Sequence, residues 1–474
     1  MTLVAPLTDF PDRLSPMVVK ELRQGLRTRL FGGVMLVIHL LLVIVTLLTG
    51  AARNSQDVVG VLDGLVWFVL VIVMPLTGFS ALSGEVKAGT MEMLVLTRLS
   101  AGRIVLGKWA AIALQSLLVA VSVVPYVVAR YVYGGSELFE DLASLGLQWL
   151  LSAVLTAAIV ALSTQKQFWL RTLFVGLPLF MFGLSSFSWF MIRSIGRSSF
   201  PGSPGIQDMP WLAYVAWLAA ASWLIFALLS FAASRIAPAS SQLPLVKRLV
   251  HLGVLLVISG LEVSFGRGSG GFLVVAGFVA VVASVDALAD DVHGLPTLYL
   301  PFYRRSWLGR LASWFLAPGW MHGFAYSAGL AGVVAAGAYV TGDADSAARF
   351  WLAMCAVWMS AFFGHLLAFR RKGDYFSALV AGGCIMAFLN VMGAILARPL
   401  SEKGMDWLLY LLPAYSVGEF DRRGIRQVFG IVFSAADLAV VAGLLWPFLL
   451  GLLALRIFRR TSRARVEAWK ILRP

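Results

Sequence analysis

The feature that most constrains this chain is a series of apolar runs, each long enough to cross a lipid bilayer. A transmembrane helix needs about 20 mostly apolar residues, with a range of roughly 17–25, and on that basis the sequence predicts about twelve spans. The predicted spans are 31–50, 58–82, 107–132, 143–164, 168–190, 211–235, 249–265, 271–288, 320–341, 350–369, 375–397 and 434–457. The segments 249–265 and 271–288 are divided only by a glycine-rich turn, and the count falls to ten if neither of them crosses.

Composition agrees with this reading and excludes a soluble enzyme. The chain is 59% hydrophobic and 13% charged, whereas soluble proteins carry about 25% charged residues. Its two cysteines, Cys355 and Cys384, lie in apolar stretches and predict neither a disulfide framework nor a cysteine-rich metal site. The net charge of +14 suits loops that face an anionic cytoplasmic leaflet and does not call for nucleic acid. We therefore predict an all-α polytopic protein of the inner or plasma membrane.

An even number of spans that starts inside places both termini in the cytoplasm. Most of the 38 lysines and arginines then lie on the cytoplasmic side, as the positive-inside rule expects. The predicted organisation is a connecting helix (1–30), a six-span unit (31–236), a linker (237–248), a second unit (249–457) and a basic cytoplasmic tail (458–474). The two units could also be repeated six-helix halves, but residue-level similarity between them is too weak to establish a duplication.

Two segments outside the spans are expected at the membrane surface. The outer loop 398–433 contains an aromatic-edged run, Trp407 to Tyr415, that is too short to span and predicts an interfacial or re-entrant helix ending near Pro413. The tail is mostly basic and is expected to rest on the anionic leaflet.

Residues 15–30 predict an amphipathic helix, because Ser15 can cap it and Pro16 suits its first position. An apolar stripe recurs every four residues at Val18, Leu22, Leu26 and Leu30. The basic residues on another face are Lys20, Arg23 and Arg27. Such a helix is expected to lie in the cytoplasmic headgroup layer. The alternative is an ordinary basic flank beside a span.

The segment between the second and third spans, 83–108, is longer and more structured than a plain loop needs to be. Gly89 can end the helix that continues from the second span, and Thr90 can cap a short helix that carries Leu94. Ser100 can start the helix that re-enters the membrane. The expected result is a helical hairpin on the cytoplasmic face, over residues 84–100, with Glu85 and Glu92 available to basic partners.

These residues resemble the permease subunits of ATP-binding-cassette transporters of the type-2 exporter class. The positions that correspond to the family's motif are occupied by Glu85, Gly89, Thr90, Glu92, Thr97, Arg98, Leu99, Ser100, Gly107 and Lys108. Arg98 departs from the family, which has proline at that position. The segment from Pro16 to Arg23 is similar to the family's connecting helix. The specific part of the resemblance covers about residues 15–110.

The resemblance implies that residues 84–100 form the coupling helix, which docks on a separate cytoplasmic ATPase that is expected to act as a dimer. This chain would then bind no cofactor itself, and ATP and magnesium would belong to the partner. The residues assigned to coupling are Glu85, Gly89, Thr90, Glu92, Leu94, Thr97 and Arg98. Membrane lipids, and a second permease or a second copy of the chain, are the other expected partners.

Enzymatic readings have weaker support, and neither a catalytic nor a metal-binding residue is predicted. The run Gly102 to Trp109 mimics a phosphate-binding loop, but Trp109 replaces the hydroxyl residue that would hold magnesium. The main enzyme alternative is a membrane prenyl- or phosphotransferase that holds magnesium through Asp286, Asp290 and Asp291. Solvated helix-end charge is the preferred interpretation of that cluster.

An ion-coupled secondary transporter is the remaining alternative. It would need buried carboxylates at mid-span, and none is evident. His39 and Asn390 lie deeper in their spans and are expected to form interhelical hydrogen bonds.

Overall fold

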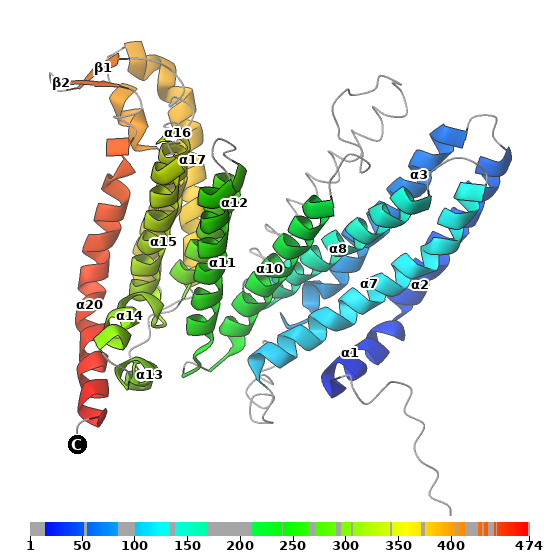
Figure 1. Cartoon of the computed structure of the whole chain (residues 1–474), viewed down its shortest axis with the longest axis horizontal. Helices are drawn as coiled ribbons and strands as arrows, with labels where there is room; N and C mark the ends of the chain where they lie inside the picture. Colours follow the sequence, from blue (N-terminus) through cyan, green and yellow to red (C-terminus); the bar gives the residue numbers. More distant parts are fainter. Residues whose placement is uncertain are drawn as a thin grey trace, which may run out of the picture. The chain divides into compact units, whose positions relative to one another are not determined.

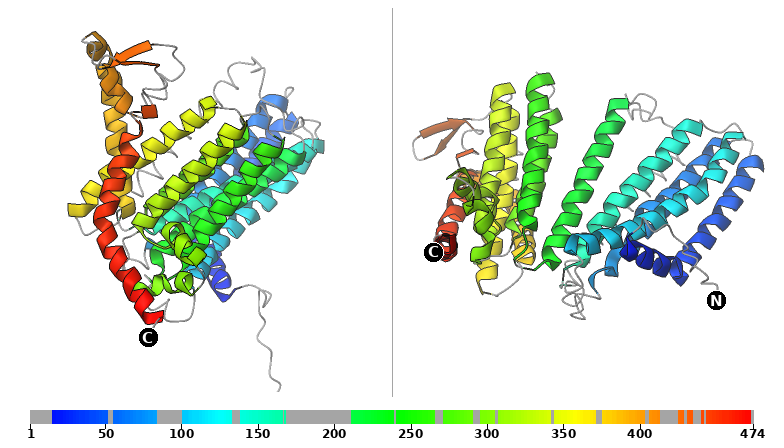
Figure 2. Two further views of the ribbon diagram at one scale, coloured as in Figure 1. Left: turned by 60° about the vertical axis from the view of Figure 1, so that its left-hand side comes forward. Right: turned by 60° about the horizontal axis from the view of Figure 1, so that its bottom comes forward.

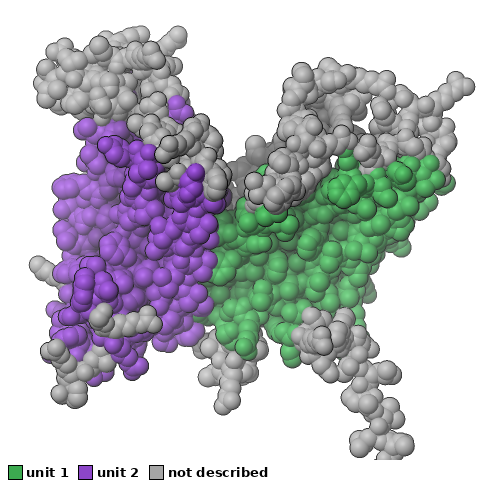
Figure 3. Space-filling view, viewed as in Figure 1, with its two compact units in different colours: residues 1–237 green, residues 238–474 purple. Residues whose placement is uncertain are grey.

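The computed structural model describes most of the apolar segments of the chain. The described residues are 15–51, 55–83, 100–132, 138–165, 167, 211–238, 240–265, 271–290, 295–304, 307–341, 344–370, 375–402, 406–412, 425–428, 431–434, 440–441 and 443–472. They form two compact units, Met1–Ala237 and Pro238–Pro474, which Figure 3 shows in different colours.

The first unit is entirely helical in its described part (Figure 1). Its helices are α1 (Pro16–Leu26), α2 (Arg29–Ala51), α3 (Ser55–Trp67), η1 (Phe68–Val73), α4 (Met74–Leu76), η2 (Thr77–Ser80), α7 (Ala101–Val132), α8 (Leu138–Ser163) and α10 (Trp211–Ile236). A π-helical turn, η1, precedes Pro75, whose missing N–H and bulky ring prevent a regular α-helical ladder there. The second predicted span is therefore one continuous but irregular helical run.

The core of the first unit is made by α2, α3, η1 and α7. Leu42, Leu70 and Val123 are examples of its fully buried side chains. Outward-facing residues of the same helices, such as Leu36 and Val121, are large, apolar and exposed. Apolar side chains on both the inner and the outer faces are the pattern of helices that lie in lipid.

The second unit is helical except for one described hairpin. Its elements are α11 (Leu243–Phe265), α12 (Gly271–Leu288), η4 (Pro296–Leu298), α13 (Leu300–Tyr303), α14 (Trp307–Leu316), α15 (Trp320–Thr341), α16 (Ala344–Arg370), α17 (Tyr375–Glu402), η5 (Asp406–Leu411), β1 (Ile425–Val428), β2 (Ile431–Ser434) and α20 (Leu445–Leu472). The antiparallel hairpin pairs Ile425 with Ser434 and Val428 with Ile431. It lies at one end of this unit, and α13, α14 and the C-terminus lie at the other (Figures 1 and 2).

Helices α16 and α17 approach closely at small residues. A side chain at Gly382 would collide with the backbone of Ser360, and one at Gly364 would collide with the backbone of Ala378. Small residues four positions apart on each helix therefore allow backbone-to-backbone contact, which is the usual way in which helices associate in lipid.

Nine helices in the described part of the chain are long and apolar enough to cross a membrane, and Val275–Leu288 and Leu445–Phe458 are shorter apolar helices. Each predicted span overlaps a helix, apart from 168–190, which lies outside the described residues; the span 434–457 does so only in its later part, because Ser434 belongs to β2 and α20 begins at Leu445. The helical, polytopic character is thus confirmed, and a total of twelve spans remains a prediction.

Two helices of the second unit extend beyond the predicted spans. Helix α11 begins at Leu243, inside the predicted linker 237–248. Helix α20 continues through the predicted tail to Leu472. One face of this extension is buried, because Ala464 and Ala468 pack in a cluster with Phe302. The tail therefore folds against its own unit through that face instead of resting on lipid through it.

The outer loop 398–433 agrees with its prediction in part, because a short helix is present and ends near Pro413. Its aromatic run forms the 3-10 helix η5, in which Leu409 and Tyr410 are buried. The Trp446 indole donates a hydrogen bond of 2.9 Å to the carbonyl of Leu411. Leu409 and Tyr410 of the aromatic run are thus enclosed by protein. The β1–β2 hairpin that follows the run was not predicted.

Candidate functional site

The residues assigned to coupling by sequence lie outside the described residues. These are Glu85, Gly89, Thr90, Glu92, Leu94, Thr97 and Arg98. Their flanks are described. Ser100 starts α7 as expected, and its hydroxyl accepts a bond of 3.4 Å from the Arg103 amide. Helix α7 and the helical run 55–83 are therefore the two described elements that adjoin 84–99 in the chain.

The predicted amphipathic helix is present as α1, but its apolar face has a different partner from the one expected. Met17, Val18 and Leu22 are buried, and α1 packs against α7. Protein, instead of lipid headgroups, therefore covers this part of the stripe. Leu30 belongs to α2 and remains exposed. The basic residues Lys20, Arg23 and Arg27 are exposed as expected.

Gly107 and Lys108, which carry part of the family resemblance, form the contact with α1. A Cβ atom at Gly107 would lie 2.8 Å from Met17 Cγ, so only glycine admits α1 at this depth without a shift. The next residue, Lys108, pairs through Nζ with Glu21 Oε1 at 3.2 Å. The two segments singled out separately in the sequence are thus joined by one steric fit and one ion pair.

The far end of α7 is joined to two other helices. The buried Arg130 guanidinium bonds Asp63 of α3 at 2.8 Å and Asp141 of α8 at 2.6 Å. At about 1.5 Å per residue, the 32 residues of α7 extend about 48 Å. Helix α7 therefore connects α1 at one end with α3 and α8 at the other.

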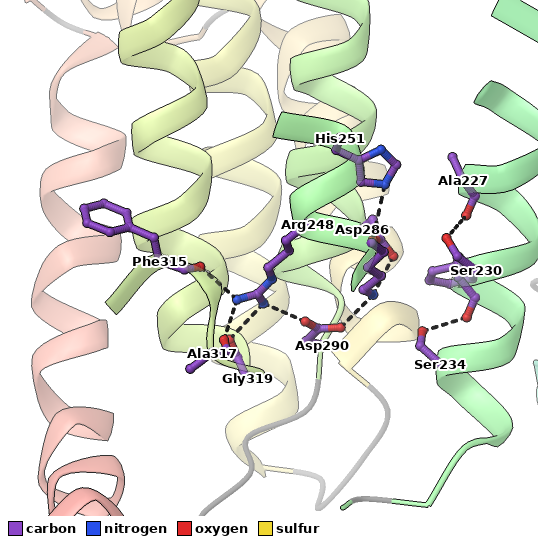
Figure 4. A network of polar contacts seen from close by, with 12 residues as sticks. Ala227, Ser230, Ser234, Arg248, His251, Asp286, Asp290, Phe315, Ala317 and Gly319 are labelled. Carbon is purple, nitrogen blue, oxygen red and sulfur yellow. Dashed lines mark hydrogen bonds and ion pairs between the residues drawn. The ribbon is translucent and has the colours of Figure 1, made fainter. Parts of the chain in front are cut away.

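The second unit contains a buried network of charges at the start of α11 (Figure 4). Lys247 Nζ bonds Asp286 and Asp290, each at 2.9 Å. Arg248 Nη2 bonds the second carboxylate oxygen of Asp290 at 2.6 Å. His251 lies 4.0 Å from Asp286. Two cations thus balance two carboxylates, which makes burial of all four groups tolerable.

Arg248 also holds the chain that leaves α14. Its Nη1 donates to the carbonyls of Phe315 at 3.2 Å and Ala317 at 2.5 Å, and its Nη2 donates to that of Gly319 at 3.3 Å. Gly319 has a φ of 118°, in the left-handed region that favours glycine. The guanidinium therefore binds carbonyls at the end of α14 and in the connection to α15, where a helix end leaves carbonyls in need of partners.

These contacts bear on the transferase alternative. Burial by itself would raise the pKa of the Asp290 carboxyl, but Lys247 and Arg248 beside it outweigh that effect and hold its pKa below the usual value. Asp286 and Asp290 are thus engaged by the protein's own cations. No group of three or more His, Cys, Asp or Glu side chains that could hold a metal occurs among the described residues. Asp291 lies outside them.

The phosphate-loop mimic is excluded by its conformation. Residues 102–109 are part of α7, and the Trp109 indole donates to the Ala153 carbonyl of α8 at 2.9 Å. A phosphate-binding loop needs backbone N–H groups that are not already used by a helix.

The two deep polar residues bond within their own helices. The His39 ring lies 2.8 Å from the Met35 carbonyl, and the Asn390 amide donates to the Met386 carbonyl at 2.8 Å. The His39 ring also meets Tyr126 of α7 edge-on, at 5.7 Å between ring centroids.

Sequence reasoning missed Lys247 and Arg248, because the pair was assigned to the linker. The available signal was spacing. Asp286 lies in the last turn of α12 and Asp290 just after its end, and an adjacent Lys-Arg pair preceding an apolar run can supply the matching charges.

Comparison with known proteins found no family model that matches the chain and no curated protein that matches it.

Proposed function

We propose that this chain is the membrane permease of an ATP-binding-cassette exporter, driven by a separate cytoplasmic ATPase. Residues 84–100 receive the motion of the ATPase, and the chain itself hydrolyses nothing. Both termini lie in the cytoplasm, and the chain resides in the inner or plasma membrane. A second permease or a second copy of the chain completes the transporter if one chain does not.

The observation that carries the proposal is the clasp between α1 and the start of α7. Gly107 fits against Met17, and Lys108 pairs with Glu21, in the first turns after residues 84–99. A displacement of that segment therefore moves α7 and α1 together, because their contact includes a fitted surface as well as an ion pair.

The same helix carries the displacement to the opposite end of the first unit. Arg130 bonds carboxylates of both α3 and α8, so a tilt of α7 shifts these two helices as well. The pair with Asp141 is largely buried and resists separation, since removing one partner leaves an uncompensated charge, whereas Asp63 is half exposed. This gives a mechanical route from a cytoplasmic docking site to the outer end of the spans.

The decisive experiment is co-purification of the full chain with a candidate ATPase whose gene neighbours its own. We expect a stable complex, and we expect Glu92→Lys to weaken it or to uncouple ATP hydrolysis from transport. Glu467→Lys makes the same charge change at an exposed residue of α20 and should leave the complex intact. Membrane insertion should be unchanged in both variants.

Three outcomes contradict parts of the proposal. If no ATPase associates with the wild-type chain, the permease assignment loses its main support. If Glu92→Lys binds and transports like wild type, Glu92 is not a contact. If both variants lose the complex equally, net charge and not the position of Glu92 controls association.

A further inference from the structure

Helix α14 presents its large apolar side chains outward. Trp307, Leu308 and Leu311 are 63%, 56% and 55% exposed, and Phe315 is also exposed. At 100° per residue these four positions fall on one face of the helix. We name Trp307, Leu308, Leu311 and Phe315 the α14 apolar face. The described part of the chain leaves most of it uncovered, although Phe315 lies close to Gly329 of α15. No helix was predicted at these residues.

The opposite face of α14 is small and packs inward. Ser313 is buried, and Ala312 and Leu316 pack against a core cluster that contains Tyr299 and Ala468. A helix that buried its apolar side in its own protein would show the reverse arrangement. The orientation of α14 is therefore set by its small residues, and its large ones are left for another environment.

Side chains from three other helices hold this orientation rigidly. Arg248 of α11 bonds the Phe315 carbonyl, His322 of α15 lies 3.1 Å from the Trp314 carbonyl, and Arg465 of α20 donates to the Ser313 carbonyl at 3.3 Å. The Arg465 guanidinium also lies 4.0 Å from the centroid of the Trp314 ring. The apolar face is thus a fixed surface, since its helix cannot roll without breaking these contacts.

The α14 apolar face is continuous with a surface that already suits lipid. On α20, the exposed residues Phe448, Leu452 and Leu455 form a stripe along an apolar helix. One turn further on, Phe458 stacks on Trp314 of α14 at 5.7 Å between ring centroids. Apolar surface therefore passes from a predicted span to α14 through an aromatic contact, and Figure 1 shows α14 beside α20.

The residues around this face suit the polar boundary of a bilayer. Tryptophan concentrates where hydrocarbon meets headgroups, and α14 carries Trp307 and Trp314. Arg304, just before α14, and Arg310, within it, are exposed, and basic residues of this kind favour anionic headgroups.

We propose that α14 lies in the membrane interface, with Trp307, Leu308, Leu311 and Phe315 embedded in lipid at the headgroup–acyl boundary. The occupant of this surface is the bilayer and not a protein. The helix then fixes the level of α11, α15 and α20 relative to the membrane, because all three hold its carbonyls. This inference does not depend on coupling to an ATPase, so its failure would leave the proposed function standing.

The test uses the full chain in lipid nanodiscs, in a Cys355→Ser/Cys384→Ser background with one new cysteine carrying a nitroxide. Labels are placed at Leu308 and, separately, at Leu311. The matched control is a label at Arg304, which is exposed just before the same helix. Collision of the nitroxide with oxygen, which partitions into lipid, is compared with collision with a water-soluble nickel chelate.

We expect the ratio of oxygen to nickel accessibility to be severalfold higher at Leu308 and Leu311 than at Arg304. A second measurement uses a fluorophore at Leu308 with brominated lipids, which should quench it more strongly than a fluorophore at Arg304. High nickel accessibility at both Leu308 and Leu311 would overturn the proposal, because the face would then be in water. Low accessibility to both reagents would overturn it too, because a second copy or another protein would then cover the face.

Discussion

Replacing Arg248 by methionine is the most informative single change in the second unit. The guanidinium is 0% exposed and bonds one carboxylate and three backbone carbonyls. Methionine keeps much of the length of the side chain but removes its charge and its donors. The change leaves Lys247 facing both Asp286 and Asp290, so one buried negative charge is no longer balanced.

The expected loss of stability can be worked from these contacts. Removing one partner of a buried ion pair costs about 3–5 kcal/mol. Lys247 still bonds Asp290, which places the effect near the lower end, at about 3 kcal/mol. Since about 1 kcal/mol shifts the melting temperature of a unit of this size by roughly 2–4 °C, we expect a fall of roughly 6–12 °C.

The assay is thermal unfolding of the purified full chain, wild type and variant, in the same nanodiscs. Arg463→Met is the matched control, because Arg463 is an exposed arginine on α20, and it should shift the midpoint by less than about 2 °C. Adding Asp290→Asn to Arg248→Met restores the balance of charge and should recover part of the loss.

Two results would refute the reasoning. A wild-type midpoint for Arg248→Met would show that the guanidinium does not hold the end of α14. A double variant that is less stable than Arg248→Met by the full cost of Asp290→Asn alone would show that charge balance is not what makes the network tolerable.

Three further predictions follow from other contacts. Lys108→Glu should weaken the contact between α1 and α7 and reduce coupling, and the double variant Lys108→Glu/Glu21→Lys should recover part of the coupling. Transport per ATP hydrolysed measures the coupling of each variant. Equal defects in the single and the double variant would contradict the ion pair. Gly382→Val should destabilise the second unit by about 1–3 kcal/mol in thermal unfolding, because the new side chain meets the Ser360 backbone, whereas Gly383→Val, at a more open position, should cost less. Because the folded pKa of Asp290 is lowered, the stability that its carboxylate contributes is complete above the unfolded pKa of about 3.9 and is lost as pH falls through the folded pKa. The difference in melting temperature between wild type and Asp290→Asn should therefore be constant from about pH 5 to 8 and shrink below about pH 4. A difference that instead vanished near pH 7 would contradict the lowered pKa.

The positions of the helices could be predicted from sequence because lipid imposes a one-dimensional rule. A segment must be apolar over a sufficient length, and every backbone group must be bonded within it. For that reason the predicted span 271–288 coincides with α12, and the predicted span 320–341 coincides with α15. The start of α7 after Ser100 was likewise predictable, since capping is decided by residues within one turn.

Boundaries that depend on distant partners were not predictable. Lys247 and Arg248 would normally end an apolar span, but Asp286 of α12 and Asp290, just after that helix, neutralise them, and α11 therefore begins before them. The basic tail after residue 457 was expected on lipid, but alanines on one of its faces meet a cluster around Phe302. In both cases the environment of the basic segment is set by residues far away in the chain, which the local sequence does not identify.

The sequence by itself determined that this chain is a helical membrane protein, where most of its helices lie, and that an amphipathic helix follows Ser15. Only the tertiary structure decided that Lys108 meets this helix, that Arg130 joins α7 to α3 and α8, and that α14 turns its large side chains outward. The physical reason is that hydropathy and capping act over neighbouring residues. Ion pairs and close packing act between segments that are far apart in the chain, and the fold alone sets their distances.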